Sequence, residues 1–333
     1  MRFLIIDVCG YDLTDEDKFF LQHKYVAGVI IFSKNFLNKD QLVNLIGSIR
    51  EFRSDLFIGV DHEGGRVQRL INGFTKIPPM SSILDYADDD LELSCHYSKN
   101  IGWLLASELL EVGIDFSFSP VLDRVGSSNV IGTRAFSDDF DNIISLASSL
   151  IEGMRSAGMA SCGKHFPGHG FVTEDTHYET AVDKRSLDDI VSTDLRPFSD
   201  LIKKDYLDSV MLAHVNYIAI DDNPVCFSEF WIKEYLFKHL GFKGVVISDD
   251  LNMKALDDTP KFIDKVNTSL LAGCDLLLIC HNQVAVKNVL SQQITIPDGF
   301  VNKIDLLKSD AIFNKIQNKD QLTFSKDICM SMF

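Results

Sequence analysis

The sequence predicts a single-domain (β/α)8 barrel, also called a TIM barrel. Eight short apolar runs are spread along the 333 residues, and stretches with helical periodicity separate them. The runs are continuously apolar rather than alternating, which is typical of parallel strands covered on both faces. Eight strands, each followed by a helix, make up this barrel. The expected strands are residues 3–9, 27–32, 56–60, 114–120, 159–163, 209–213, 244–248 and 275–280.

A doubly wound open sheet is the alternative arrangement of alternating strands and helices. That fold commonly carries a G-x-G-x-x-G motif directly after its first strand, and no such motif follows residue 9 here. The number of expected strands also favours the closed barrel. Length does not decide between one domain and two, because α/β barrels commonly exceed about 250 residues as single domains.

Amphipathic stretches at residues 42–52 and 143–154 predict two of the intervening helices. Ser228 is suited to cap a further helix that ends near Leu240, with Gly241 as its stop. Pro197 lies inside the helical pattern 187–202 and is expected to kink or split that helix. We assign residues 1–333 to one catalytic domain, in which helices from about residue 294 pack on the outside of the barrel.

Composition narrows the possible partners and the compartment. The net charge of −16 disfavours nucleic acids and anionic membranes, because the field of the protein repels phosphate. No apolar run reaches transmembrane length, and the four-residue apolar run after Met1 and Arg2 is too short for a signal-peptide core. The seven cysteines show no C-x-x-C spacing, so we expect buried, reduced thiols. These features together predict a cytoplasmic protein.

Polar side chains cluster directly after the expected strands. In a TIM barrel the carboxyl ends of all eight strands face one mouth, where catalysis takes place. Each of these residues taken alone is equally well explained as a solvated loop residue, but several unrelated loops rarely all begin with such groups by chance. The residues are Asp61, Asp123, Arg134, Lys164, His165, His214, Asp249, Asp250 and His281.

The richest segment is the loop from Lys164 to His177. It contains three histidines, of which His165 and His169 are four residues apart, a spacing that on a helix would suit a metal site. A proline and two glycines within the same stretch preclude a helix, and the charge of Lys164 disfavours a nearby divalent ion. We therefore expect neither a metal ion nor another cofactor.

Asp175 and His177 form the second pattern in this loop. A carboxylate two residues before an imidazole can orient it and raise its basicity, and histidine titrates near neutrality. The glycines allow the loop to move, which would bring His177 over a bound substrate. On the residues alone, a surface loop with a solvated histidine explains the pattern equally well.

Asp249 lies at the end of the seventh expected strand, where a rigidly held carboxylate is suited to attack an anomeric carbon. Asp250 is adjacent, and strand alternation sends the two side chains in different directions. Helix capping is the structural explanation for a pair of aspartates here. One of the two aspartates could act as the nucleophile and the other as the helix cap, and their spacing does not say which does which.

Together these segments resemble glycoside hydrolase family 3, and within it the single-domain β-N-acetylglucosaminidases of peptidoglycan recycling. The likeness spans nearly the whole chain. Small departures are Thr176, where the family usually has serine, and Lys34, where arginine is common. The matching segments are residues 59–69, 130–136, 164–177 and 248–253, and residues 28–32 and 211–214 also fit.

The resemblance implies a barrel enzyme with a retaining mechanism. By position, Asp249 matches the family nucleophile, and His177, held by Asp175, matches the acid/base. The implied reaction removes terminal GlcNAc from a muropeptide or a chitooligosaccharide through a covalent glycosyl-aspartate, in a monomer without nucleic-acid or membrane partners. Six further positions match sugar contacts: Asp61, Arg69, Arg134, Lys164, His165 and His214.

Two other functions fit part of the pattern. A phosphorylase is one, because a histidine acid/base does not repel an incoming phosphate as a carboxylate would. A non-catalytic sugar-binding barrel is the other; it would keep Asp61, Arg69 and Arg134 and tolerate loss of Asp249 or His177. Both of the latter residues are present, which favours an enzyme.

Overall fold

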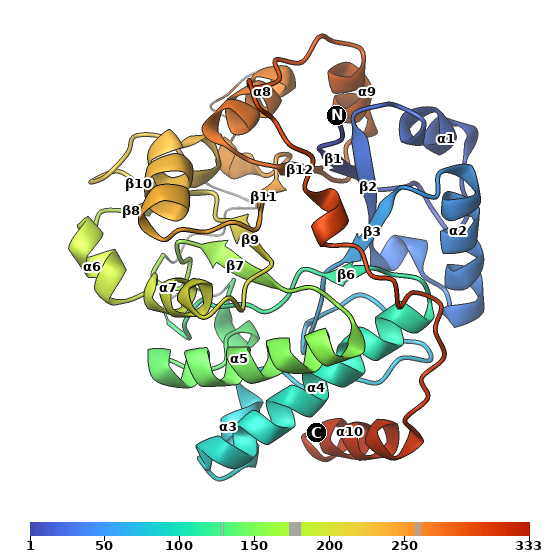
Figure 1. Cartoon of the computed structure of the whole chain (residues 1–333), viewed down its shortest axis with the longest axis vertical. Helices are drawn as coiled ribbons and strands as arrows, with labels where there is room; N and C mark the ends of the chain where they lie inside the picture. The colour runs from blue at the N-terminus through green and yellow to red at the C-terminus, as the bar shows by residue number, and fades with distance from the viewer. Residues whose placement is uncertain (127, 129, 173–180, 257–258, 260) are drawn as a thin grey trace.

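The computed structural model describes residues 1–126, 128, 130–172, 181–256, 259 and 261–333. Eight parallel strands follow one another in chain order and form a ring surrounded by helices (Figure 1). Next to the end of β6, Cys162 N donates to Ser119 O at 2.8 Å and Leu122 N donates to Lys164 O at 2.7 Å, which closes the ring. The predicted (β/α)8 barrel is therefore confirmed. Its strands are β1 (Leu4–Ile6), β2 (Val26–Ile31), β3 (Phe57–Val60), β6 (Phe116–Ser117), β7 (Cys162–Phe166), β9 (Ser209–Leu212), β11 (Val245–Asp250) and β12 (Leu276–Ile279).

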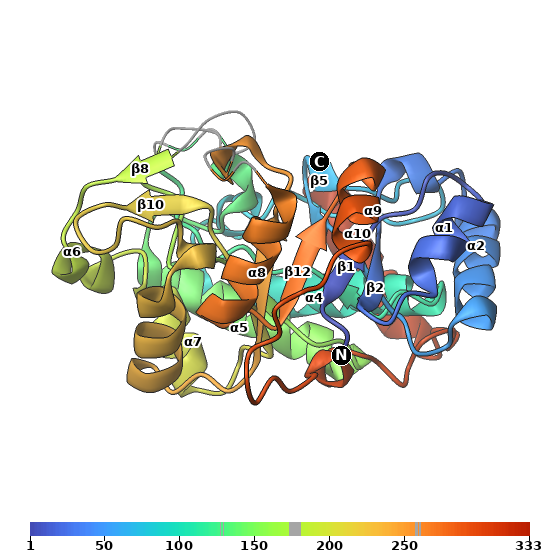
Figure 2. The same ribbon diagram turned by 90° about the horizontal axis from the view of Figure 1, so that it is seen from above.

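Two short pairs of strands and several 3-10 turns lie outside the eight-stranded barrel. The antiparallel pair β4 (His62–Gly64) and β5 (Val67–Gln68) follows β3, and the parallel pair β8 (Ala181–Asp183) and β10 (Val215–Tyr217) extends to one side of the barrel (Figure 2). The sequence analysis predicted neither pair. The 3-10 turns are η1 (Ser33–Asn35), η2 (Gly132–Arg134), η3 (Val225–Phe227), η5 (Lys254–Leu256) and η6 (Ile304–Leu306).

Helices surround the ring and include those predicted from periodicity. The pattern 42–52 lies in α2, whose N-terminus is capped by Asn38, and 143–154 lies in α5, capped by Asp139. The helices are α1 (Asp15–Leu21), α2 (Lys39–Phe52), α3 (Ser82–Tyr86), α4 (Leu91–Glu111), α5 (Phe140–Ala157), α6 (Leu187–Ser192), α7 (Arg196–Lys203), η4 (Phe230–His239), α8 (Phe262–Ala272), α9 (Gln283–Leu290) and α10 (Lys319–Ser331).

The sequence signals predicted for helix ends, at Pro197, Ser228 and Gly241, are found at helix ends in the structure. The helical pattern 187–202 is split, because α6 ends at Ser192 and α7 begins at Arg196 with Pro197 in its first turn. Ser228 Oγ accepts a hydrogen bond from Trp231 N at the start of η4, whose backbone bonding is π-helical. Gly241 follows that helix with φ +70°, a conformation that favours glycine.

The fifth barrel strand lies further along the chain than expected. It was predicted at residues 159–163 and is found at Cys162–Phe166, so Lys164 and His165 lie within β7 rather than after it. Likewise Asp249 and Asp250 belong to β11. The apolar run ends before the strand does, because the ladder of β7 with β9 continues through the pairs Lys164–Met211 and Phe166–Leu212.

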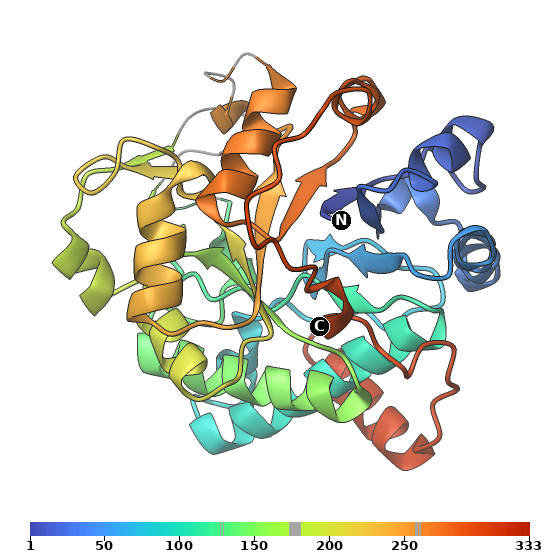
Figure 3. The same cartoon turned by 45° about the horizontal axis from the view of Figure 1, so that its top comes forward.

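The barrel interior is a core of apolar side chains to which every barrel strand contributes. Ile304 and Leu307 belong to this core although they come from the segment after the last strand. Lys303 Nζ donates to Gly244 O and pairs with Asp275, both at the amino ends of strands, so this segment closes the end opposite the mouth. The chain then continues to α10, which packs against α4 (Figure 3).

The cysteines only partly match the expectation. All seven are free and five are buried, but Cys95 is half-buried and Cys9 is exposed. The expectation of buried thiols is wrong for Cys9, because this residue follows β1 on the rim of the mouth, where loops meet solvent. Among the described residues, no helix is long and apolar enough to cross a bilayer.

Helices α4 and α5 lie against each other over most of their length (Figure 1). Two glycines make this approach possible. A Cβ on Gly102 would lie 2.1 Å from Leu150 O, and a Cβ on Gly153 would lie 2.0 Å from Lys99 O. Neither position has room for even a methyl group, so the backbones of the two helices are in direct contact.

We expect Gly153→Ala to lower the free energy of unfolding by about 1–3 kcal/mol, because the added methyl group overpacks the α4–α5 contact. Gly47→Ala in α2 is the matched control, since nothing lies within 4 Å of its Cβ position. That control is expected to stabilise the protein by about 0.5–1 kcal/mol. Urea denaturation measures both values, and equal effects of the two substitutions would contradict the contact.

Candidate active site

The mouth contains a connected group of charged side chains around Glu63. Its carboxylate accepts two hydrogen bonds of 2.8 Å from Nε and Nη2 of Arg134, and one of its oxygens lies 2.5 Å from Lys164 Nζ. Lys164 Nζ also lies 2.9 Å from Asp61 Oδ1, and Arg69 Nη2 lies 3.8 Å from Asp61 Oδ2. We refer to Asp61, Glu63, Arg69, Arg134 and Lys164 as the charged cluster. It unites four of the predicted sugar-contact residues.

Burial makes these pairs strong. The side chains of Lys164 and Glu63 are 2% and 3% exposed, whereas Asp61 and Arg69 keep 22% and 34% of theirs open to solvent. Burial alone raises the pKa of Glu63, but the charges of Arg134 and Lys164 outweigh it and hold that pKa well below its usual range. Burial lowers the pKa of Lys164, and Asp61 with Glu63 reverses this, so its net pKa is raised. Both groups are therefore charged at neutral pH.

Four elements bring these side chains together at the mouth. Asp61 and Glu63 come from the end of β3 and from β4, Lys164 comes from β7, and Arg134 closes η2. The alternation of side chains along β7 places Lys164 on the same side of the strand as Cys162, which belongs to the barrel interior. Burial raises the pKa of the Cys162 thiol to about 12, and the charges of Lys164, Asp61 and Asp249 also act on it. Lys164, Asp61 and Asp249 are therefore all close enough to this part of the barrel interior to act on it electrostatically.

His165 is held by Asp123. His165 Nδ1 lies 2.7 Å from Asp123 Oδ2, and the same carboxylate accepts hydrogen bonds from His165 N at 3.2 Å and His169 N at 2.7 Å. Both side chains are buried. His214 follows β9 and is also buried. His165 therefore follows Lys164 in β7, and the contact with Asp123 fixes the orientation of its ring.

The two aspartates of β11 have different environments. Asp250 Oδ1 accepts hydrogen bonds of 3.0 Å from Asn252 N and Cys280 N, so this carboxyl joins the ends of β11 and β12. Burial, with the nearby charges of Asp249 and Asp7, raises the pKa of Asp250 to about 7. Asp249 is half-buried, and its charge acts on His169 across the mouth as well as on Cys162. Asp250 thus makes a structural contact between the ends of two strands, whereas Asp249 Oδ1 accepts a hydrogen bond of 2.8 Å from Asp250 N.

Asp175 and His177 lie outside the described residues. The described stem of their loop is well anchored. Tyr217 OH donates to Gly168 O, and Gly168 packs against Asp194 at a φ of +145°. The Arg185 guanidinium lies 3.9 Å from the ring centre of Phe171.

Two residues of this site had no role in the sequence analysis. Glu63 was noted only as part of a matching segment, and Asp123 only as one of the polar residues after the strands. The signal for Glu63 was the number of cations expected at the mouth, because buried cations require carboxylate partners. Asp123 had no comparable signal, since its partner His165 is 42 positions away.

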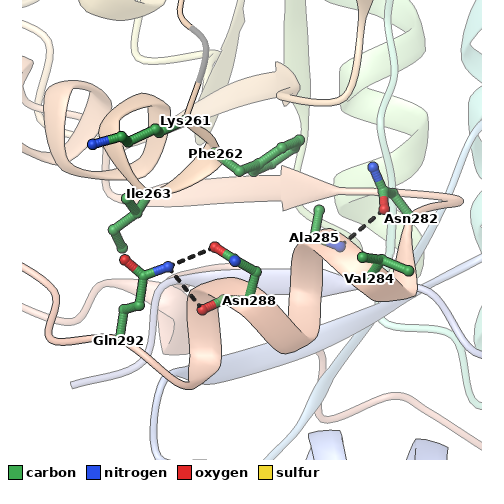
Figure 4. A pocket seen from close by; sticks show the side chains of 8 residues that line it. All are labelled: Lys261, Phe262, Ile263, Asn282, Val284, Ala285, Asn288 and Gln292. Atoms are coloured by element: carbon green, nitrogen blue, oxygen red, sulfur yellow. Dashed lines mark hydrogen bonds between the residues drawn. The ribbon is translucent and has the colours of Figure 1, made fainter.

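A separate pocket lies between the N-terminal end of α8 and the length of α9 (Figure 4). Its lining includes Lys261, Asn282 and Gln292, and none of the residues of the mouth described above. It is therefore not the predicted site. Within the part of the chain that the structure describes, no group of three or more His, Cys, Asp or Glu side chains is arranged to hold a metal ion.

We expect Glu63→Gln to lower the free energy of unfolding at pH 7 by about 3–5 kcal/mol, because it leaves buried cations without their charge partner. The pKa of Glu63 is depressed by folding, so the ionised form stabilises the protein above the unfolded value of roughly 4.3, and this stability is lost as the pH falls below it. The difference from the wild type should therefore shrink below about pH 4. Urea denaturation from pH 7 to pH 3 measures it.

Glu51→Gln is the matched control for that substitution. Glu51 is exposed on α2, and its replacement should change the unfolding free energy by less than about 0.5 kcal/mol. A loss in Glu63→Gln that is the same at every pH would show that the missing charge is not its cause.

Comparison with known proteins identifies the family of the chain. The sequence pattern of the Glycosyl hydrolase family 3 N terminal domain matches residues 4–304. Relatives named beta-hexosaminidase include one from Psychromonas ingrahamii, 43% identical over 93% of this chain and 91% of its own length. Another, from Shewanella frigidimarina, is 45% identical over 88% of this chain and 86% of its own.

Solved structures give the same result. Native NagZ from Neisseria gonorrhoeae is 36% identical and superposes with a TM-score of 0.89 over 98% of both chains. The same protein in complex with N-trifluoroacetyl-D-glucosamine gives a TM-score of 0.90 over 99% of this chain and 97% of that one. The family expected from the sequence motifs is confirmed. With a family match from residue 4 to residue 304 and a charged mouth at the carboxyl ends of the barrel strands, this chain belongs to glycosyl hydrolase family 3.

Proposed function

We propose that the protein is a retaining exo-β-N-acetylglucosaminidase that removes terminal GlcNAc from peptidoglycan fragments or chitooligosaccharides. The observation that carries this proposal is Asp249, a carboxylate at the end of β11 beside a mouth lined by the charged cluster. The beta-hexosaminidase relatives and the NagZ complex with a glucosamine derivative support N-acetylglucosamine as the sugar. In this proposal the enzyme works in the cytoplasm as a monomer, without a metal or cofactor.

The charged cluster and its neighbours bind the sugar. Asp61 and Arg69 are the most exposed members, so they are the first to meet a sugar that enters the mouth. Asp61 accepts hydrogen bonds from sugar hydroxyls, whereas Arg69, Arg134 and Lys164 donate them. His165 and His214 complete the set. Because Glu63 and Asp123 already hold several of these side chains, little conformational entropy is lost when the sugar binds.

The chemistry takes place in two steps. Asp249 attacks the anomeric carbon while the bond between that carbon and the leaving oxygen breaks. His177 gives a proton to the leaving oxygen. A covalent glycosyl ester on Asp249 results. His177 then takes a proton from water, which attacks the same carbon and releases Asp249 and the free sugar with retained configuration. Asp175 orients His177 in this proposal. The two backbone amides on Asp250 Oδ1 support a structural role for that carboxyl and so favour Asp249 as the nucleophile.

We expect the purified protein to hydrolyse an aryl N-acetyl-β-glucosaminide and to leave the matched aryl β-glucoside largely intact. The assay is run with and without inorganic phosphate, and the released sugar is identified by mass. Free GlcNAc in both buffers is the expected product. Formation of the sugar 1-phosphate would identify a phosphorylase, and no turnover of either substrate would favour a sugar-binding protein.

Asp249→Ala should abolish this turnover, because the replacement removes the nucleophile. In the wild type, a slow fluorinated N-acetylglucosaminide should leave a covalent label that peptide mass spectrometry finds on Asp249. Asp250→Asn is the control, and it should retain the label on Asp249. A label on Asp250 or on Glu63 would refute the assignment.

A further inference from the structure

Asp123 is wholly buried and lies in the loop after β6, behind the sugar-facing side of the mouth. Its neighbours hold it in place, since Leu122 N donates to Lys164 O and Val125 N donates to Ser137 O at 2.8 Å. We propose that Asp123 is a positioning residue that acts through His165: it holds the imidazole with a proton on Nδ1 and leaves Nε2 to contact the sugar. This inference depends on the proposed function at one point, namely that the group in contact with His165 Nε2 is a sugar.

The hydrogen bonds on Asp123 determine which ring nitrogen carries the proton. Burial raises the pKa of the Asp123 carboxyl, but the interaction with His165 and the hydrogen bonds outweigh it, so its net pKa is lowered. An ionised carboxylate only accepts hydrogen bonds. The 2.7 Å contact with His165 Nδ1 therefore requires the proton on Nδ1. Nε2 is then the only ring nitrogen left to contact a ligand.

Only a carboxylate satisfies this site. Both oxygens of Asp123 face donors: Oδ1 accepts from His169 N, and Oδ2 accepts from His165 N and His165 Nδ1. Asparagine offers one acceptor oxygen and one NH2 group. Whichever way its amide turns, the NH2 group meets a backbone N–H. With the amide nitrogen toward His165, it donates to Nδ1 and moves the ring proton to Nε2.

The same carboxylate also joins two parts of the mouth. It binds the strand residue His165 and, through His169 N, the stem of the loop that follows β7. A buried aspartate that merely satisfied loop amides would explain the two backbone contacts but would not need the contact with the imidazole. The test must therefore report on the ring of His165 itself and not only on stability.

The first measurement is ¹⁵N NMR of the histidine rings in the full-length wild-type protein, with His165 assigned by His165→Ala. The shifts should show a protonated Nδ1. A ring protonated on Nε2 alone would overturn the proposal, and this measurement requires neither an Asp123 variant nor any enzymatic activity.

The second measurement is the kinetics of Asp123→Asn with an aryl N-acetyl-β-glucosaminide. Loss of the partner behind a metal-ligating histidine costs about 10–100-fold, and we expect kcat/KM to fall by a comparable factor here. His165→Ala and the double variant complete a cycle. If Asp123 acts through His165, adding Asp123→Asn to His165→Ala should cause little further loss. A loss equal to that in the wild-type background would overturn the proposal.

Asp115→Asn provides the matched control at the opposite end of the barrel. Asp115 is also buried and accepts from Ile58 N at 2.7 Å and from Arg50 at 2.9 Å. Its replacement should lower the melting temperature and leave kcat/KM and the His165 ring signals unchanged. If the wild type hydrolyses no N-acetylglucosaminide, the proposed function fails, whereas the ring measurement still decides the role of Asp123.

Discussion

The ion pairs of Glu63 with Lys164 and Arg134 are the constraint on which the rest of the mouth depends. Burying a lysine and an arginine costs several kcal/mol each unless both are paired. One carboxylate pairs both cations here, with 2.8 Å hydrogen bonds to Arg134 and a 2.5 Å contact to Lys164. It thereby joins β4 to β7 and to η2. Without Glu63, the two cations would repel each other in the same volume.

The backbone around Glu63 is shaped to make this possible. Gly64 and Gly65 both have positive φ values, +113° and +53°, which lets the β4–β5 pair turn back over the mouth. A Cβ on Gly64 would lie 2.6 Å from Pro78 O, so no other residue fits there without movement. This tight turn places Glu63 inward and brings Arg69 back beside Asp61. Gly64 and Gly65 therefore shape the mouth although neither has a side chain.

Sequence reasoning succeeded where burial is continuous and failed where charge enters the barrel. All eight barrel strands were predicted because each has an apolar run. The fifth was placed too early because Lys164 and His165 look like the start of a loop, although β7 carries both. Pairings such as Glu63 with Arg134, 71 positions apart, depend on tertiary structure that no local pattern encodes. The different environments of Asp249 and Asp250 likewise depend on the amides of Asn252 and Cys280, which spacing in the sequence does not place.

Ile304 and Leu307 close the end of the barrel opposite the mouth, and their late position in the chain matters during synthesis. Every residue of the mouth named above precedes residue 282, whereas the side chains that seal the opposite end come more than 20 positions later. A ribosome therefore completes the working end of the barrel before the residues that shield its core from water have been synthesised. Until they are made, the apolar interior of the barrel lacks the side chains that close this end.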